Sequence, residues 1–168
     1  MKSGASKIGG LLLACVALAV VAFALHQALK PRPTVEVLVQ SVKRDASYRE
    51  LERALESDDP KQRLTAVQAL LELQTDEAFR LLEKATGDRS TVVRVAIVQR
   101  LQTLPEQRAL PIILNLLDDR EFGITRDAIT ALQRLNTNNY DFRFEAPPNE
   151  RLAVITQCKR DIRERLKQ

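Results

Sequence analysis

The chain has 168 residues, enough for one compact domain with a short appendage, and its two Cys exclude a disulfide scaffold. Aromatic residues make up only 4%, so the core must use Leu, Ala and Val, which favours helices over a β-sandwich. The formal net charge is +4 and the isoelectric point is about 9.3, which raises the question of a nucleic-acid partner.

The positive charge is confined to the start of the chain. Residues 1–44 hold six Lys or Arg against Glu36 alone, a net +5. Residues 45–168 hold the other 20 basic and 21 acidic residues, a net −1. Nucleic-acid affinity comes from cations on the binding domain itself, which release counterions from phosphates. No nucleic-acid partner is therefore expected.

A basic tail, residues 1–7, precedes an apolar segment. Ile8 to Leu25 contains only apolar residues and glycine, and 18 residues of helix span about 27 Å, close to the roughly 30 Å of a hydrocarbon core. The pattern predicts a single-pass membrane anchor over residues 8–29, ended by a Pro-rich juxtamembrane linker at 30–33. A short basic N-terminus usually stays cytoplasmic, so the remaining domain is expected outside the cytoplasm.

Two other interpretations of this leader remain open. Ala22-Phe23-Ala24 has the small-x-small form of a signal-peptide site, and cleavage after Ala24 would release an exported soluble protein. Leu12 to Cys15 also resembles a lipoprotein site, although the apolar run before it is short and continues beyond Cys15.

From about residue 34 the sequence repeats with a period of 31 residues. Three columns of apolar positions, at helical offsets, define one helix of each unit: Val39, Leu70, Leu101 and Leu132; Val42, Leu73, Leu104 and Leu135; Val35, Ala66, Ile97 and Ala128. Three further columns define the other helix: Tyr48, Phe79 and Leu110; Leu51, Leu82 and Ile113; Ala54, Ala85 and Leu116. Each unit is therefore expected to be a helix pair.

Turn-forming residues separate these helices. Asp59-Pro60, Gly87-Asp88 and Gly123 are expected between the two helices of a unit, and Gln74 to Asp76 and Pro105 between units. One pair cannot bury its own apolar stripe, so about three pairs are predicted to stack into an all-α solenoid over residues 34–168. An ordinary helical bundle is the alternative.

The repeat resembles the short bacterial form of HEAT repeats, also called lyase-like HEAT repeats and armadillo-like in fold. The resemblance rests on residues 60–70 (PKQRLTAVQAL) and 88–101 (DRSTVVRVAIVQRL), and the third unit departs from it with Thr125 at the Arg position. Residues 140–151 (YDFRFEAPPNER) look like the ending of many such proteins. The resemblance covers about residues 45–166 and implies an α-solenoid, but it says little about function.

Both ends of a solenoid need covers. Thr34 to Arg44 falls in register with a second helix and is predicted to form an N-terminal half-repeat, although its Val-rich sequence also permits a short strand. A C-terminal capping helix is predicted from about Pro148. Its apolar face is expected to hold Leu152, Ile155, Ile162 and Leu166.

No catalytic, cofactor or metal site is predicted, and no small-molecule substrate. The single histidine, His26, lies at the edge of the leader, and Cys15 and Cys158 are too far apart for a metal or redox pair. Cys158 is interpreted as a partly buried structural residue. The pairs Asp58-Asp59 and Asp118-Asp119 are interpreted as caps and turns. Arg63 and Arg94 are interpreted as donors to carbonyls or carboxylates of the adjacent turn.

Candidate binding residues are therefore sought on the surface. The second helices repeat a polar ridge made of Gln68, Gln99, Thr130, Glu72, Thr103 and Arg134. Tyr140, Phe142 and Phe144 form either a plug over the last repeat or a docking patch. The expected function is a non-catalytic scaffold, held in the membrane by residues 8–29, that binds a protein partner. A cleaved exported binding protein and a lyase-like enzyme accessory are the alternatives.

Overall fold

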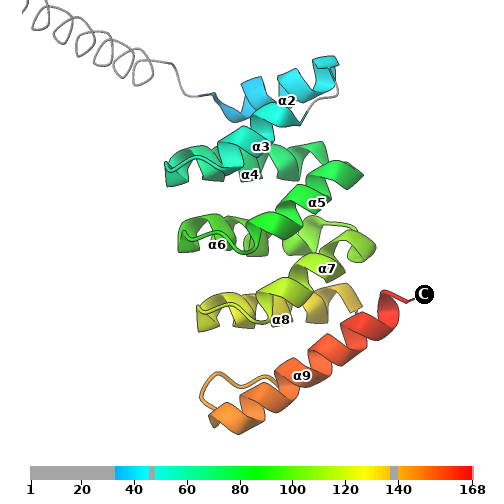
Figure 1. The fold of residues 1–168 in the computed structure, drawn as a ribbon. Coiled ribbons are helices and arrows are strands. Elements are labelled where there is room, and N and C mark those ends of the chain that lie inside the picture. The colour runs from blue at the N-terminus through cyan, green and yellow to red at the C-terminus, as the bar shows by residue number, and fades with distance from the viewer. Residues whose placement is uncertain (1–32, 46–47, 137–139, 168) are drawn as a thin grey trace, which may run out of the picture. The chain divides into compact units, whose positions relative to one another are not determined.

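The computed structural model describes residues 33–45, 48–136 and 140–167 (Figure 1). The chain divides into two units, Met1–Arg32 and Pro33–Gln168, and only the second contains described residues. The predicted anchor at 8–29, the cleavage site after Ala24 and His26 all lie outside them. Within the described part, no helix is both long and apolar enough to cross a bilayer.

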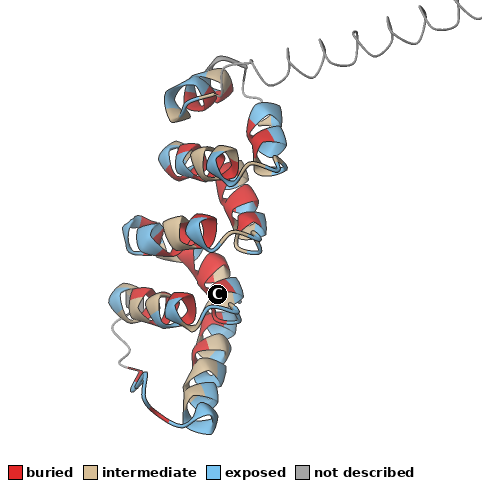
Figure 2. Cartoon of the chain, turned by 90° about the vertical axis from the view of Figure 1, so that its left-hand side faces the viewer, coloured by how far each residue is buried: buried red, intermediate tan, exposed pale blue. Residues whose placement is uncertain are grey.

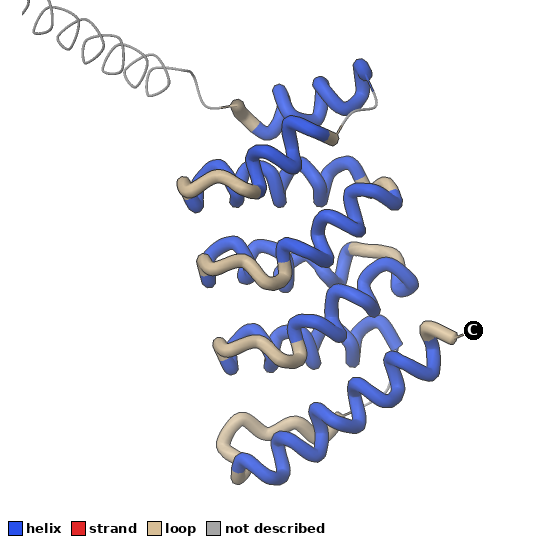
Figure 3. The backbone as a smooth tube through the Cα atoms, in the orientation of Figure 1, coloured by secondary structure: helices blue, strands red, loops and turns tan. Residues whose placement is uncertain are grey.

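The second unit is built from helices in two layers. The elements are α2 (Val35–Asp45), α3 (Arg49–Leu55), α4 (Pro60–Leu73), α5 (Asp76–Ala85), α6 (Thr91–Arg100), the 3₁₀ turn η1 (Leu101–Thr103), α7 (Glu106–Leu116), α8 (Phe122–Asn136) and α9 (Pro148–Arg165). One layer, the first layer, contains α3, α5, α7 and α9, and the second layer contains α2, α4, α6 and α8 (Figures 1 and 2). Figure 3 shows helices joined by loops throughout the described residues.

This arrangement confirms the predicted all-α solenoid of stacked helix pairs. Successive second-layer helices contact one another from α2 to α8, and each of α3, α5 and α7 packs on a second-layer helix of its own or a neighbouring unit. Residues 35–45 are helical, so the alternative of a short strand at 34–44 is wrong. Val-rich composition did not decide the local structure because α2 packs its apolar positions onto α4.

The apolar columns predicted from the 31-residue period form the core. Leu70 of α4, Leu101 of η1 and Leu132 of α8 are fully buried at equivalent positions of successive units. The column of Ala66, Ile97 and Ala128 is fully buried as well, and its small residues let neighbouring helices approach closely. Figure 2 shows that buried positions concentrate where the two layers face each other.

Local chemistry explains where the helices begin and end. The Asp59 side chain accepts a hydrogen bond from the Lys61 backbone N–H at 3.0 Å, and Pro60 occupies the first position of α4. Gln74 ends α4 in a left-handed conformation with φ of 49°. The assignment of Gly123 as a break between helices is wrong, because it lies in the first turn of α8. The break is instead made by the loop before α8, where Asp119 Oδ1 accepts from the Glu121 backbone N–H at 2.7 Å.

The two end elements cap the stack in different ways. The α2 half-repeat buries Leu38, Val39 and Val42 against the core, as predicted. In α9 the buried residues are Cys158 and Ile162, whereas Leu152 is 62% exposed and Leu166 is also exposed. The predicted face of α9 is therefore only partly correct, because α9 meets α7 along an arc centred on Cys158, with Leu152 and Leu166 to one side of it.

Candidate functional site

The predicted ridge lies on the second layer. Gln68 and Gln99 are exposed on α4 and α6, and Thr130 is half-buried on α8. Val37, one period before Gln68, extends this column onto α2 and is 55% exposed. Sequence reasoning did not include Val37, although the 31-residue period identifies it. The column therefore runs over all four second-layer helices.

The second column of the ridge is less regular. Glu72 is exposed at the end of α4, but Thr103 lies in η1, where its hydroxyl donates to the Arg100 carbonyl at 2.8 Å. Arg134 of α8 reaches back to the preceding unit and donates to the Gln102 side-chain oxygen in η1. At its α8 end, this column is thus already engaged in a hydrogen bond between successive units.

A hollow of about 430 Å³ opens on this layer across α2, α4 and α6. It is lined by Val35, Glu36, Gln68, Leu71, Glu72, Ala96, Gln99 and Arg100. Gln68, Glu72 and Gln99 of the predicted ridge meet there, whereas Thr130, Thr103 and Arg134 lie elsewhere. The pKa of Glu36 is lowered by a hydrogen bond from the Glu36 backbone N–H and, to a smaller extent, by one from the Thr34 hydroxyl. This carboxylate is therefore ionised at neutral pH.

At one edge of the stack, buried arginines join successive units. Arg63 is 4% exposed, and its Nε and Nη2 donate to Asp88 Oδ2 and Oδ1 at 2.7 and 3.0 Å. Its Nη1 donates to the Ser57 carbonyl at 2.8 Å. The hydrogen bond to Asp88 raises the pKa of Arg63, although burial opposes this effect. The predicted donation to an adjacent turn is confirmed.

The same contacts recur one unit later. Arg94 is 2% exposed and makes the same two-pronged contact with Asp119, at 2.7 and 3.0 Å. Its Nη1 donates to the Asp88 carbonyl at 2.7 Å. The series ends at Thr125, a buried residue whose hydroxyl faces the Asp119 carbonyl at 3.4 Å. We call this set the Arg–Asp ladder: Arg63–Asp88 and Arg94–Asp119.

The ladder is structural in its chemistry. Burial is the largest influence on Asp88 and disfavours its charge, but hydrogen bonds from Arg63 and the Ser90 backbone N–H outweigh it and leave the pKa of Asp88 lowered. Arg63 and Asp88 therefore stay charged and fully engaged with each other, leaving no group for a ligand. The sequence predicts carbonyl or carboxylate acceptors without naming Asp88 and Asp119, although the same 25-residue separation links the two partners in each pair.

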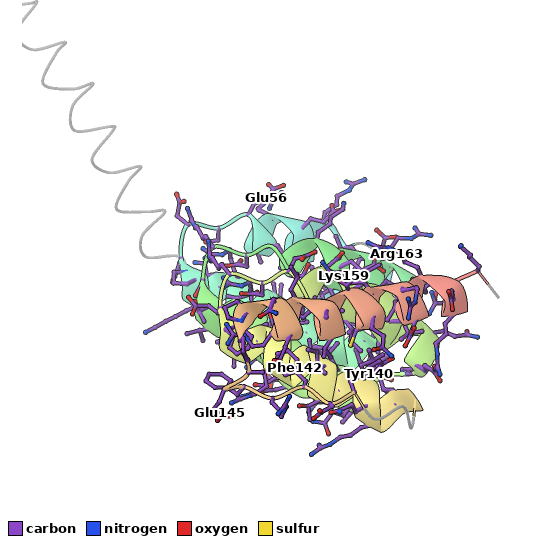
Figure 4. The ribbon with its side chains drawn as sticks, turned by 90° about the horizontal axis from the view of Figure 1, so that it is seen from below. Glu56, Tyr140, Phe142, Glu145, Lys159 and Arg163 are labelled. Atoms are coloured by element: carbon purple, nitrogen blue, oxygen red, sulfur yellow. The ribbon has the colours of Figure 1, made fainter. Side chains whose placement is uncertain are left out.

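The aromatic segment divides into two parts. Tyr140 is buried between α8 and α9, and its hydroxyl donates to Asp161 Oδ2 at 3.1 Å (Figure 4). Phe142 and Phe144 instead pack against Phe122 of α8, with ring centroids 5.6 and 4.8 Å apart. Only Phe144, at 48%, is largely exposed. Tyr140 and the half-buried Phe142 thus act as a plug. The contribution of Phe122 has no signal in the sequence, because this residue lies far from the aromatic segment along the chain.

Cys158 is fully buried in α9, more so than predicted. Burial, followed by the charge of Asp161, raises the pKa of its thiol to about 12. The thiol is therefore protonated at neutral pH. Within the described segments, no group of three or more His, Cys, Asp or Glu residues is placed to hold a metal ion.

Stacked helix pairs with a regular exposed ridge define a helical-repeat protein. The family model for HEAT repeats matches residues 48–133, which include α3 to α7 and most of α8. The chain belongs to the HEAT-repeat family. HEAT repeats generally serve as protein-interaction scaffolds. No curated protein matches the chain.

Proposed function

We propose that this protein is a non-catalytic scaffold that is tethered to a membrane and binds a protein partner through its second layer. The family supports the scaffold role, because HEAT repeats generally act in protein–protein interaction. The tether rests on the apolar segment of residues 8–29. With only residues 30–33 as a linker, such a tether would keep the bound partner close to the bilayer.

One observation carries the choice of surface. The hollow of about 430 Å³ joins three second-layer helices and is lined by both amide and charged side chains over an apolar base that includes Leu71 and Ala96. Gln68 and Gln99 offer hydrogen-bond donors and acceptors on neighbouring helices. Interfaces combine apolar contact with satisfied polar groups in this way. A protein segment crossing α4 and α6 would contact both amides.

Photo-crosslinking in cells tests this surface. A photoreactive residue placed at Ala96 in the full chain should capture a discrete partner, and Gln68→Glu with Gln99→Glu should abolish that capture. Gln107→Glu is the matched control, because Gln107 is an exposed glutamine of α7 in the first layer. Capture that survives the double substitution, or that Gln107→Glu abolishes equally, would contradict the proposed surface.

Membrane extraction and intact mass test the tether. The full-length chain should stay in the membrane pellet after carbonate treatment, and its mass should include residues 1–29. A soluble product that begins at Leu25 would contradict the tether and establish instead an exported binding protein cleaved after Ala24.

A further inference from the structure

The C-terminal ends of the first-layer helices occupy equivalent positions in successive units, and in one unit this position binds a cationic side chain. The equivalent residues, one period apart, are Glu56, Gly87 and Asp118. In the third unit, Lys159 of α9 donates from Nζ to Asp118 Oδ1. The Lys159 side chain is only 18% exposed, so its methylene stem is packed while its ammonium reaches the carboxylate.

The corresponding position of the first unit is open. A hollow of about 440 Å³ lies between α3 and α5, lined by Glu52, Leu55, Glu56, Leu81, Lys84, Ala85, Gly87 and Asp88. Leu81 and Ala85 are buried and Leu55 is half-buried, which gives the hollow an apolar base. Glu52 and Glu56 are exposed at its rim. Both the apolar base and the acidic rim suit a Lys or Arg side chain.

The charges at this rim are not balanced within the described part of the chain. Glu52 lies in the first turn of the short helix α3, and Glu56, four residues on, caps its C-terminal end. The two like charges repel each other, and the helix dipole disfavours the negative charge of Glu56. Asp88 is engaged by Arg63, and Lys84 forms no ion pair with either glutamate. A cation placed between Glu52 and Glu56 would relieve this repulsion.

We propose that the hollow between α3 and α5 binds a lysine or arginine side chain from a segment of a partner protein. The aliphatic stem would lie on Leu55, Leu81 and Ala85, and the charged head would lie between Glu52 and Glu56. The charge complementarity reproduces what Lys159 and Asp118 achieve two units later. The second unit has Gly87 at the equivalent of Glu56, so the acidic pair is specific to the first unit.

This site is separate from the second-layer ridge, because α3 and α5 belong to the other layer. If the site exists, the protein that occupies it must present an exposed Lys or Arg side chain. This proposal does not depend on the membrane tether. A basic membrane-facing segment of another protein is a suitable source, whereas nucleic acid and anionic lipid would be repelled by the two glutamates.

The test uses the full chain in nanodiscs of uncharged lipid, with methyl groups of alanine labelled for NMR. The probes are acetylated and amidated pentapeptides, Ser-Ala-X-Ala-Ser, in which X is Lys, Arg or norleucine. The Lys and Arg peptides should shift the Ala85 methyl signal in a saturable way. The norleucine peptide keeps the stem without the charge and should bind at least about fivefold more weakly.

Variants assign the effect to the acidic rim. Glu52→Gln with Glu56→Gln should remove the difference between Lys and norleucine, and both substitutions are exposed, so the fold should persist. Glu83→Gln is the matched control, because Glu83 is the equivalent of Glu52 in the second unit. Equal binding of the norleucine peptide, an equal effect of Glu83→Gln, or shifts confined to Ala96 would each overturn the proposal. Gln68→Glu and Gln99→Glu should leave it unchanged, so this site and the ridge can fail independently.

Discussion

Arg94 carries a full charge into the interior of the stack, where it is 2% exposed. A buried charge is tolerated only when a partner and hydrogen bonds replace its lost hydration. Asp119 supplies the opposite charge with two-pronged geometry, and the Asp88 carbonyl takes a third N–H. The contacts therefore also define how one unit sits on the next.

Removing one partner of this pair should be costly. Arg94→Met leaves the Asp119 carboxylate buried without its cation, and we expect the free energy of unfolding to fall by about 3–5 kcal/mol in urea titrations. Asp119→Asn should cost a similar amount, and the double variant should cost clearly less than the sum of the two.

The exposed pair of Arg89 and Asp58 is the matched control. Its Nη2–Oδ1 distance is 2.8 Å, but the Arg89 side chain is 62% exposed, so Arg89→Ala should cost no more than about 1 kcal/mol. Strict additivity in the Arg94 and Asp119 double variant would show that the two side chains do not interact energetically.

Asp88 should make stability depend on pH in the acid range. Its pKa is lowered in the folded state, so its contribution is present above the unfolded-state pKa of about 3.9 and is lost as pH falls through the folded value. The loss of stability caused by Asp88→Asn should therefore be large at pH 7 and shrink as the pH falls below the unfolded-state pKa. Urea titrations across this range measure it, with the exposed Glu145→Gln as a control. A pH-independent difference would contradict the paired carboxylate.

At the scale of single residues, the sequence predicts which side chains donate the buried hydrogen bonds, but not which aspartates accept them. Arg63 and Arg94 were expected to donate to the adjacent turn because they share one column of the repeat, and both do. Their carboxylate partners lie 25 residues further along, in the loop of the next unit. Identifying Asp88 and Asp119 required knowing how successive units stack, which the period alone does not specify.

At the scale of helices, the buried faces are predicted well where the 31-residue period repeats them. Features that depend on a single residue outside this pattern are predicted poorly. The columns of Leu70 and Leu51 fix which faces are buried, because every unit repeats the same choice. Gly123 is misassigned from the sequence because a lone glycine is tolerated inside a helix, here in the first turn of α8. Leu152 was misplaced because α9 lies beyond the periodic region, and its contact with α7 decides its buried face.

The last pair of the stack explains why Thr125 replaces arginine. Thr125 is buried at the position equivalent to Arg94, but α9 follows in place of another unit with a loop aspartate. The residue one period after Asp119 is Glu150, which pairs with Arg143 at 3.1 Å. A guanidinium at position 125 would thus have no carboxylate of its own.

Thr125→Arg should accordingly destabilise the protein by about 3 kcal/mol or more, because it buries an unpaired charge in a packed site. Thr125→Val removes only long hydrogen bonds to carbonyls, at 3.4 and 3.5 Å, and should change stability by less than about 1 kcal/mol. Thermal unfolding of the two variants measures the contrast. Wild-type stability in Thr125→Arg would mean that α9 supplies a carboxylate after all.

Across the Pro33–Gln168 unit, contacts run mainly between neighbouring helices, as in other repeat proteins. The effect of a cavity at one end should therefore fade along the stack. We expect Ile162→Ala to reduce hydrogen-exchange protection most in α9 and α7 and least in α4. The exposed Leu152→Ala is its control and should change little. Uniform loss of protection over all helices would indicate one cooperative unit instead.

The Arg–Asp ladder also gives the stack a direction in which it can grow. Each arginine uses the aspartate of the following loop, so a tandem copy of residues 89–119 would bring both a new guanidinium and the carboxylate it needs. A tandem copy of the next 31 residues, 120–150, would instead bring Thr125 and Glu150 at the equivalent positions, so it would add no Arg–Asp pair to the ladder. Duplication of a unit can therefore extend the ladder on the N-terminal side of Thr125 but not on its C-terminal side.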